Sequence, residues 1–482
     1  IMYFLLIDRF ADGDLANNKP VIDPAIHPKA NHLGGDFSGI IQQLSAGYFD
    51  SLGVNTIWVS PITLNADGAW GLWTKGITSK FSGYHGYWPI SNTTIDPHFG
   101  NDSTFKLLID EVHRKNKNII VDYVANHVHQ NHPLYQQHPD WATDLYLPDG
   151  TMNTEKWDEH RLTTWFDTFL PTLNLEKVEV TDAMTDSAMF WLDNYDIDGF
   201  RHDATKHIPE IFWRTLTKKI KAHQKQLNAE KSVFQIGETY GSPELIRSYI
   251  SSGMLDAQFD FNLYDAAIDA FANPSKDFGN LARVLDEGIR NYGAHHLMGN
   301  ITGNQDRARF ISYADGSIQF SEDAKLAGWT RDIQNHEGKG FSELESLFAL
   351  IMTIPGIPCI YYGDEIGLPG GNDPDNRRMM QFDSLNKEQL LLRNAVAELT
   401  KIRSSRMSLV YGGTRIVRKD QLLVIERSYG AEKTLMVFSN ANGGEIQLNG
   451  VPVILRTNGC EIQQNTLIFR GNGYAILAIQ NS

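Results

Sequence analysis

Short apolar runs that end in polar residues recur along the chain, and amphipathic stretches separate them. Strand-length apolar runs that alternate with helical segments are typical of parallel βα units. Segments 104–115 and 209–227 show the helical spacing of apolar residues. The eight runs are YFLLIDRF (3–10), TIWVSP (56–61), NIIVDYVANH (118–127), IDGFRHD (197–203), SVFQIGE (232–238), AQFDF (257–261), MGNITGNQD (298–306) and PCIYYGDE (358–365).

Eight strand-then-helix units predict an α/β protein built as a parallel (β/α)8 TIM barrel. A doubly wound open sheet is the alternative, because it also alternates strands with helices. The sequence shows no Gly-rich phosphate loop after a strand, and eight units favour closure. We therefore expect a closed barrel.

Two segments depart from this alternation. About fifty residues, rich in Trp, Asp, His and Pro, precede the helix expected near residue 183. A connection of that length is usually functional or a small subdomain, which predicts an inserted B domain after strand three. After about residue 404, strand-like runs alternate with Gly and Asn turns, which predicts a C-terminal antiparallel β-sandwich. The predicted domains are a barrel at 1–127 and 180–403, domain B at 128–179 and domain C at 404–482.

Composition excludes several classes of protein. The chain has 482 residues, 41% of them hydrophobic, which is enough for a large core. A net charge of −15 without a Lys/Arg cluster argues against a nucleic-acid partner. No run of about 18 apolar residues occurs, so we expect no transmembrane segment. The only cysteines, Cys359 and Cys460, exclude a disulfide framework and a zinc cluster.

Polar residues gather at the ends of the predicted strands. Strand four ends in Arg201 and Asp203, strand five in Glu238. Strand seven ends in Asp306. In a barrel the carboxyl ends of the strands share one face, so these side chains should converge. Each alone is more often a structural ion-pair residue, but three carboxylates at one face favour a catalytic site.

Paired carboxylates suit glycoside cleavage, in which one is the nucleophile and the other, kept protonated, is the general acid. Arg201 stands two residues before Asp203, on the same side of the strand, and should lower the pKa of that carboxyl. Glu238 follows the apolar run VFQIG, which favours its protonated form. The pattern predicts Asp203 as nucleophile and Glu238 as acid.

Four ordered motifs make the chain resemble the α-amylase superfamily of retaining glycoside hydrolases over nearly its whole length. They are DYVANH after strand three, GFRHDATKH after strand four, IGETY after strand five and GNQD after strand seven. The resemblance is strongest to the cyclomaltodextrinase, neopullulanase and α-amylase group. It implies Asp203 as nucleophile, Glu238 as acid/base and Asp306 as the carboxylate that grips sugar hydroxyls.

The resemblance also implies residues around the reacting sugar. His127 and Arg201 would line the subsite that holds the catalytic carboxylates. In the motif YHGYW, Tyr87 would stack on the sugar ring and His85 would lie beside it. Ten tryptophans and eighteen tyrosines fit a sugar cleft, although ordinary packing must account for most of them.

More distant subsites follow from the same resemblance. Lys206 and His207 would lie on the leaving-group side. The segment GGNDPDNRR resembles the part of the family that supplies Asp373 and Arg377 to the far glycone subsites.

Two positions depart from the family pattern. Family members usually have His before the last catalytic Asp, where this chain has Gln305. A glutamine donates a hydrogen bond but cannot become a cation, so we expect weaker transition-state contacts or a shifted pH dependence. Typical α-amylases have Asp where Thr172 stands, and that Asp binds the calcium between barrel and domain B. Losing a carboxylate predicts a weakened site, although Asn126 and the His207 carbonyl remain.

A different calcium site is better supported by the sequence. DGDLANN (12–18) and GGD (34–36) resemble the first-loop calcium site of cyclodextrin glucanotransferases and neopullulanases. An ordinary Asx-rich turn is the alternative for such residues. Two separated segments that match together favour an all-oxygen Ca²⁺ shell. The predicted ligands are Asp12, Asp14, Asn17, Asn18, the Gly34 carbonyl and Asp36.

The resemblance implies an enzyme that hydrolyses α-1,4-glucosidic bonds in starch-derived maltooligosaccharides, in endo fashion and with retention at the anomeric carbon. Cyclomaltodextrinase, neopullulanase or α-glucanotransferase activity is the alternative, since one glycosyl-enzyme can pass its sugar to water or to another sugar. A non-catalytic carbohydrate-binding protein is a third reading, which the three carboxylates oppose.

Location and assembly follow less directly from the sequence. Calcium and starch chemistry lead us to expect an exported protein. The chain begins inside an apolar run, IMYFLLIDRF, as if upstream residues had been removed. The sequence leaves homo-oligomer formation open.

Overall fold

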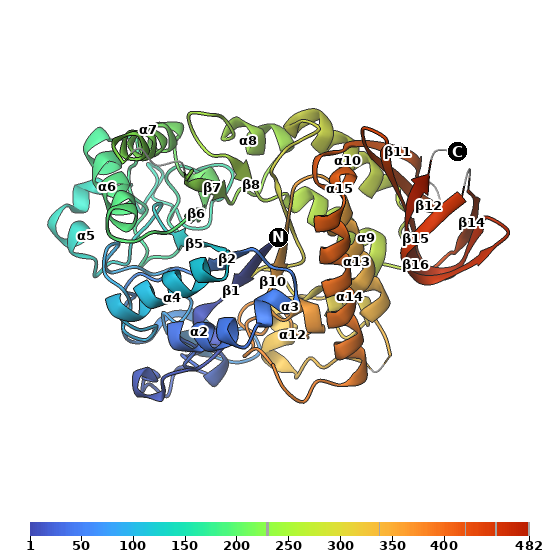
Figure 1. Cartoon of the computed structure of the whole chain (residues 1–482). Coiled ribbons are helices and arrows are strands. Elements are labelled where there is room, and N and C mark those ends of the chain that lie inside the picture. The colour runs from blue at the N-terminus through green and yellow to red at the C-terminus, as the bar shows by residue number, and fades with distance from the viewer. Residues whose placement is uncertain (228–230, 337, 420, 449–450, 481–482) are drawn as a thin grey trace. The chain divides into compact units, whose positions relative to one another are not determined.

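The computed structural model describes residues 1–227, 231–336, 338–419, 421–448 and 451–480 (Figure 1). The chain forms two compact units. The N-terminal unit is Tyr3–Phe49 and Asn55–Phe259, and the C-terminal unit is Ile1–Met2, Asp50–Val54 and Asp260–Ser482. Their main boundary follows β8 rather than a predicted domain boundary, so the predicted domain limits stay predictions.

Eight strands make one sheet in the order β8-β7-β6-β5-β2-β1-β10-β9. The paired strands run parallel, with Asp122 of β5 opposite Arg201 of β6 and Arg201 opposite Ile236 of β7. Each strand overlaps one of the eight predicted runs, and the predicted barrel is confirmed. The bounds are β1 Met2–Leu5, β2 Thr56–Val59, β5 Asn118–Tyr123, β6 Gly199–His202, β7 Phe234–Gly237, β8 Ala257–Gln258, β9 Gly299–Ile301 and β10 Ile357–Tyr361.

Helices follow most strands, and local sequence explains where they begin. In α4 (Asp102–Arg114), Asn101 and Thr104 form a capping box, and the apolar side chains fall on one buried face. The other helices of the N-terminal unit are α1 Ile7–Phe10, α2 Phe37–Ser45, α5 Pro133–Gln137, α6 Val178–Asn194, α7 Glu210–Gln226 and α8 Pro243–Ser248. Its 3₁₀ turns are η1 Leu15–Asn17, η2 Pro28–Ala30, η3 Pro139–Trp141 and η4 Thr205–His207.

The connection between β5 and α6 is long, as the sequence predicts. Apart from α5 and η3 it is held by isolated bridges such as Thr154 to Trp165 and His127 to Thr172. A separate two-stranded ribbon, β3 (Trp70–Trp73) and β4 (Ser79–Phe81), lies between β2 and the YHGYW motif. The long connection carries His127, and the loop after the ribbon carries His85 and Tyr87; loops can present side chains that strands keep inside.

The C-terminal unit contains the remaining helices and the antiparallel strands. Its helices are α9 Phe261–Ala272, α10 Gly279–Tyr292, α11 Phe310–Ala314, α12 Ala324–Thr330, α13 Phe341–Thr353, α14 Lys387–Ser405 and α15 Met407–Tyr411, with the 3₁₀ turn η5 Asp364–Ile366. The short helix α3 Tyr48–Ser51 lies at a boundary between the units. No described helix is both long and apolar enough to cross a membrane.

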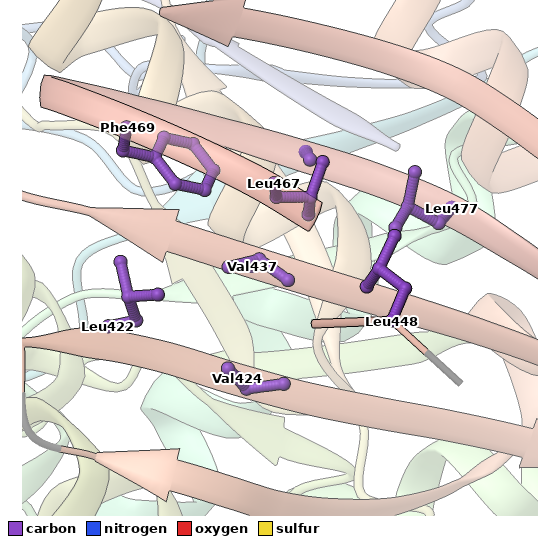
Figure 2. Packing of buried hydrophobic residues seen from close by; sticks show 8 residues of the cluster. Leu422, Val424, Val437, Leu448, Leu467, Phe469 and Leu477 are labelled. Atoms are coloured by element: carbon purple, nitrogen blue, oxygen red, sulfur yellow. The ribbon is translucent and has the colours of Figure 1, made fainter. Parts of the chain in front are cut away.

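Among the described residues, the antiparallel C-terminal strands pair into one six-stranded sheet. Val424, Val437 and Ala475 lie opposite one another on three adjacent strands, so their side chains share one face. Figure 2 shows this face with Leu422, Leu467, Phe469 and Leu477 packed around Val437. The strands are β11 Gly413–Lys419, β12 Leu422–Tyr429, β13 Glu432–Ser439, β14 Gly444–Gln447, β15 Val451–Gln463 and β16 Thr466–Gln480.

Candidate active site

The centre of the N-terminal unit's site is the buried guanidinium of Arg201, which is 1% exposed. Its Nη1 lies 2.8 Å from Asp122 Oδ1 and 2.8 Å from Asp203 Oδ1. Its Nη2 lies 2.5 Å from Glu238 Oε2. Register explains the first contact, because Asp122 and Arg201 are direct partners on β5 and β6. One cation therefore joins three carboxyl groups.

Burial and neighbouring charges shift the pKa values of the residues around Arg201. Burial raises the pKa of Glu238; the Arg201 charge opposes the rise, and Asp203 adds to it through its charge and a hydrogen bond. The pKa of Asp122 rises to about 6 for the same main reason, desolvation, although Arg201 and Tyr87 oppose it. The pKa of Arg201 is raised, since its carboxylate neighbours outweigh desolvation. The site therefore holds a fixed cation beside Glu238, a carboxyl group whose pKa burial raises.

Aromatic rings enclose the ionic centre. Tyr87 Oη donates to Asp122 Oδ2 at 2.9 Å, and Trp58 Nε1 donates to the same oxygen at 3.2 Å. The Arg201 guanidinium lies 5.0 Å from the Trp58 ring centre and 5.8 Å from that of Tyr87. Rings and guanidinium support one another through cation–π attraction, so the position of Arg201 is fixed from several sides.

Two histidines position Tyr87. The Tyr87 backbone N donates to His85 Nδ1 at 3.0 Å, and the two rings stack with centroids 5.7 Å apart. His127 Nε2 is 3.0 Å from the Tyr87 carbonyl. Burial lowers the pKa of His127 to about 4, so this imidazole is neutral near pH 7. Through these contacts the structure groups His85, Tyr87 and His127 with Arg201, Asp203 and Glu238.

Lys206 and His207 lie in turn η4, which follows β6 and Asp203 in the chain. Lys206 Nζ pairs with Asp158 Oδ1 at 3.0 Å. His207 Nδ1 lies 2.7 Å from the Arg161 carbonyl, and burial lowers the pKa of His207 to about 4. Both predicted residues therefore contact the insertion between β5 and α6.

The remaining catalytic and substrate-binding candidates, Gln305, Asp306, Asp373 and Arg377, lie in the C-terminal unit. Gln305 Nε2 donates to Asp306 Oδ2 at 2.9 Å. Arg377 Nη2 pairs with Asp306 Oδ1 at 3.1 Å, and Arg377 Nη1 pairs with Asp373 Oδ1 at 2.9 Å. Asn376 Nδ2 donates to the Gln305 carbonyl at 2.7 Å and fixes the same loop. Their predicted convergence with Asp203 and Glu238 stays a prediction.

The first-loop residues are brought together around Asp36, the buried N-cap of α2. Asp36 Oδ2 accepts from the backbone N of Asp14 at 2.8 Å and from Asn17 Nδ2 at 2.9 Å. Asn18 Nδ2 donates to Asp12 Oδ2 at 2.6 Å. Asp14 also caps η1 through its Oδ1, so the turn interpretation holds for this residue.

Three side-chain oxygens of this loop are available to a ligand. Asp12 Oδ1, Asn17 Oδ1 and Asn18 Oδ1 are buried, and the structure gives them no hydrogen-bond partner. Gly34 lies against Asn18, since a Cβ added there would be 2.4 Å from Asn18 Oδ1. The described residues contain no group of three or more His, Cys, Asp or Glu side chains placed to hold a metal. The loop offers a carboxylate oxygen of Asp12 and the amide oxygens of Asn17 and Asn18, and both kinds of oxygen suit a hard cation.

The second predicted calcium site has a different environment. Thr172 is fully buried, and its Oγ1 donates to the Thr164 carbonyl at 2.7 Å. The Asn126 carbonyl accepts from Leu173 N at 2.9 Å, whereas Asn126 Oδ1 is buried without a hydrogen-bond partner. The weakened site stays a prediction.

Sequence reasoning missed several contributors. The sequence places Asp122 at the end of strand three, among the positions expected to converge, but it gave Asp122 no role and no pattern indicated its contact with Arg201. Trp58 belongs to a different strand and reads as an ordinary core residue. Asp158 and Arg161 lie in the long connection, whose path cannot be derived from residue spacing.

Comparison with known proteins agrees with the motifs. The model of the α-amylase catalytic domain family matches residues 4–406. The chain is similar to a cyclomaltodextrin glucanotransferase of Bacillus sp. (strain 1011), 27% identical over 95% of this chain and 61% of the relative. It is also similar to a cyclomaltodextrinase of Geobacillus thermopakistaniensis (strain MAS1), 26% identical over 92% of this chain and 69% of the relative.

A solved structure agrees over the whole chain. The crystal structure of an Anoxybacillus α-amylase is 27% identical, has a TM-score of 0.77, and covers 100% of this chain and 98% of its own. The chain spans 61% of the first curated relative's length, so the activity of that whole protein does not transfer directly. Since the family model covers most of the chain, this protein belongs to the α-amylase family of glycoside hydrolases.

Proposed function

We propose that the protein cleaves α-1,4-glucosidic bonds of maltooligosaccharides within the chain, by double displacement with retention. One observation carries the proposal: Asp203 and Glu238 both bind the guanidinium of Arg201, and the pKa of Glu238 is raised. Sharing one guanidinium keeps the two carboxyl groups close. Close carboxyls, about 5–5.5 Å apart, suit retaining glycosidases, because inverting enzymes leave room for a water.

In the first step Glu238 donates its proton to the glycosidic oxygen while Asp203 attacks the anomeric carbon. The bond to the leaving sugar breaks, and a covalent glycosyl ester forms on Asp203. In the second step water attacks that carbon and gives its proton to Glu238. Arg201 stays charged throughout and stabilises Asp203 as carboxylate when it leaves.

Further residues bind the sugar in this proposal. Tyr87 supplies a stacking face, and neutral His127 lines the same subsite without adding charge. Asp306, steadied by Gln305 and Arg377, accepts hydrogen bonds from ring hydroxyls. Lys206 and His207 contact the leaving group.

Cyclic substrates and sugar acceptors are the second candidate. The relatives named cyclomaltodextrin glucanotransferase and cyclomaltodextrinase favour it, since both act on cyclomaltodextrins by name. A glycosyl ester accepts a sugar hydroxyl in place of water with no change of residues. The same two carboxyl groups therefore support hydrolysis and transfer. A binding protein without turnover is disfavoured by the intact pair Asp203 and Glu238.

We further propose a Ca²⁺ ion in the first loop. The orphaned oxygens of Asp12, Asn17 and Asn18 fit it, together with Asp14, Asp36 and the Gly34 carbonyl. The ion would neutralise the aspartates and fix the loop, and it takes no part in bond cleavage. Export of the protein is also proposed, and fractionation of the native host tests it.

The first experiment incubates the protein with maltoheptaose, β-cyclodextrin and pullulan separately, in the presence of calcium, and separates the products by chromatography. Faster attack on maltoheptaose than on β-cyclodextrin supports the first proposal, and the reverse order supports a cyclomaltodextrinase. Products longer than maltoheptaose reveal transfer. Asp203→Asn is the control, and turnover that survives this change contradicts the mechanism.

A further inference from the structure

Residues 156–161 of the insertion form a short strap against turn η4, which follows β6. Backbone hydrogen bonds close the loop that contains it. Trp165 N donates to the Asn153 carbonyl at 2.8 Å, and Glu155 N donates to the Trp165 carbonyl at 3.1 Å. The strap is therefore a compact loop of defined shape.

The root of the strap is fixed by several hydrogen bonds. Arg161 Nη1 donates to the Lys206 carbonyl at 2.7 Å and to Tyr249 Oη at 2.9 Å. Tyr249 Oη donates to the same Lys206 carbonyl at 3.3 Å. His207 Nδ1 lies 2.7 Å from the Arg161 carbonyl. These bonds hold the main chain of Lys206 in place.

The tip of the strap is held differently. Lys206 Nζ pairs with Asp158 Oδ1 at 3.0 Å; the Lys206 side chain is 9% exposed and that of Asp158 is 87% exposed. An ion pair with one solvated partner contributes little and weakens with salt. The ammonium therefore sits on a fixed main chain, but its partner is exchangeable.

The turn that carries Lys206 is joined to the catalytic acid. Thr205 N donates to the Glu238 carbonyl at 2.9 Å, and Glu238 N donates to Thr205 Oγ1 at 3.1 Å. Lys206 is the next residue. It is therefore one residue from the backbone that positions the acid/base, and the proposed function places its amine against the leaving group, where an acceptor sugar would also bind.

We propose that Asp158 is a specificity-determining residue for the acceptor: its ion pair with Lys206 competes with acceptor hydroxyls for the same ammonium and lowers sugar transfer relative to hydrolysis. The proposal rests on the glycosyl-enzyme mechanism proposed above. In transfer, the ester bond between Asp203 and the anomeric carbon breaks, and a bond from that carbon to the acceptor oxygen forms. The acceptor's proton passes to Glu238.

The test measures products longer than the donor against hydrolysis products, with maltoheptaose as donor and maltose added at increasing concentration. We expect Asp158→Asn to reach equal transfer and hydrolysis at about fivefold lower maltose than the wild type, the factor that corresponds to an exposed ion pair of about 1 kcal/mol. The matched control is Glu159→Gln, which removes the same charge from the neighbouring exposed residue and should behave as the wild type.

Salt provides a second measurement that needs no variant to fold. Raising the salt to about 1 M, where the Debye length is about 3 Å, should move the wild-type product ratio toward that of Asp158→Asn and leave the variant unchanged. A wild-type ratio that ignores salt, or an Asp158→Asn ratio equal to the wild type or shifted toward hydrolysis, overturns the inference alone. Absence of any maltoheptaose turnover by the wild type overturns the proposed function and this inference together.

Discussion

Replacing Arg201 by Met should destabilise the protein in a strongly pH-dependent way. Arg201 is the buried cation among Asp122, Asp203 and Glu238, with contacts of 2.8, 2.8 and 2.5 Å. Removing one partner of a buried ion pair costs about 3–5 kcal/mol, because a charge is left without compensation. We expect a loss of that size in the free energy of unfolding at pH 8, where burying these carboxyl groups without their cation is most costly.

The loss should shrink at low pH. In the wild type the pKa of Asp122 rises from 3.8 to about 6, and that of Glu238 is raised as well. Between pH 3.8 and about 6 the folded protein holds more protons at Asp122 than the unfolded chain does. Protonation of Asp122 therefore favours folding at low pH, and this stabilisation is lost as pH rises through about 6. Without Arg201 both pKa values rise further. At pH 5 protonation then relieves the repulsion, by roughly 1.4 kcal/mol for each unit of pKa.

The assay is urea unfolding followed by tryptophan fluorescence at pH 5 and pH 8, with the midpoint difference converted through the slope m. Arg214→Met is the matched control. Arg214 is exposed, and the ion pair described for it is with Glu210, one helical turn away. This variant should change stability by no more than about 0.5 kcal/mol at either pH. An Arg201→Met loss below about 1 kcal/mol at pH 8, or an equal loss at both pH values, would refute the reasoning.

Three further outcomes are expected. Gln305→His should raise kcat/KM at pH values below about 6.5, where His is a cation beside Asp306; a pH profile identical to the wild type contradicts a role for this position. Removing calcium with EDTA should lower Tm, since an ion present at 100 times its Kd contributes about 2.7 kcal/mol, and Asn18→Ala should abolish the difference between calcium and EDTA; an unchanged Tm rejects the first-loop site. Leu477→Ala removes a fully buried side chain of the C-terminal sheet and should lower the free energy of unfolding in urea by about 2–5 kcal/mol. The control Leu391→Ala, at an exposed position, should lower it by well below about 1 kcal/mol. Equal losses in the two variants would show that this sheet does not unfold with the rest of the protein.

The sequence by itself determined the eight strands and the residues at their ends. A strand such as the one before Asp203 is buried on both faces of a parallel sheet, so its sequence is an apolar run that can be recognised as a strand without knowledge of its neighbours. The motifs then placed Asp203, Glu238, Tyr87 and His127 near one centre, because strand ends of a barrel share a face. The Gly and Asn turns between short strand-like runs likewise predicted the antiparallel strands of the C-terminal region.

Only the tertiary structure decided which side chains meet. Asp122 contacts Arg201 because β5 and β6 are adjacent and their register places these two residues opposite each other. Residue spacing along the chain predicts neither the order of the strands in the sheet nor their register. Trp58 adds its indole from a third strand. The pKa of Glu238 likewise depends on burial by residues that are distant in sequence.

The long insertion shows the same limit most clearly. Its length and composition predicted a functional segment, yet nothing local to Asp158 indicates Lys206, 48 residues further along the chain. A loop's path is set by the contacts it finds on the folded scaffold, since it has no apolar period of its own. Local patterns therefore determined the elements and their candidate residues, whereas packing between distant elements decided the partners and the pKa values of those residues.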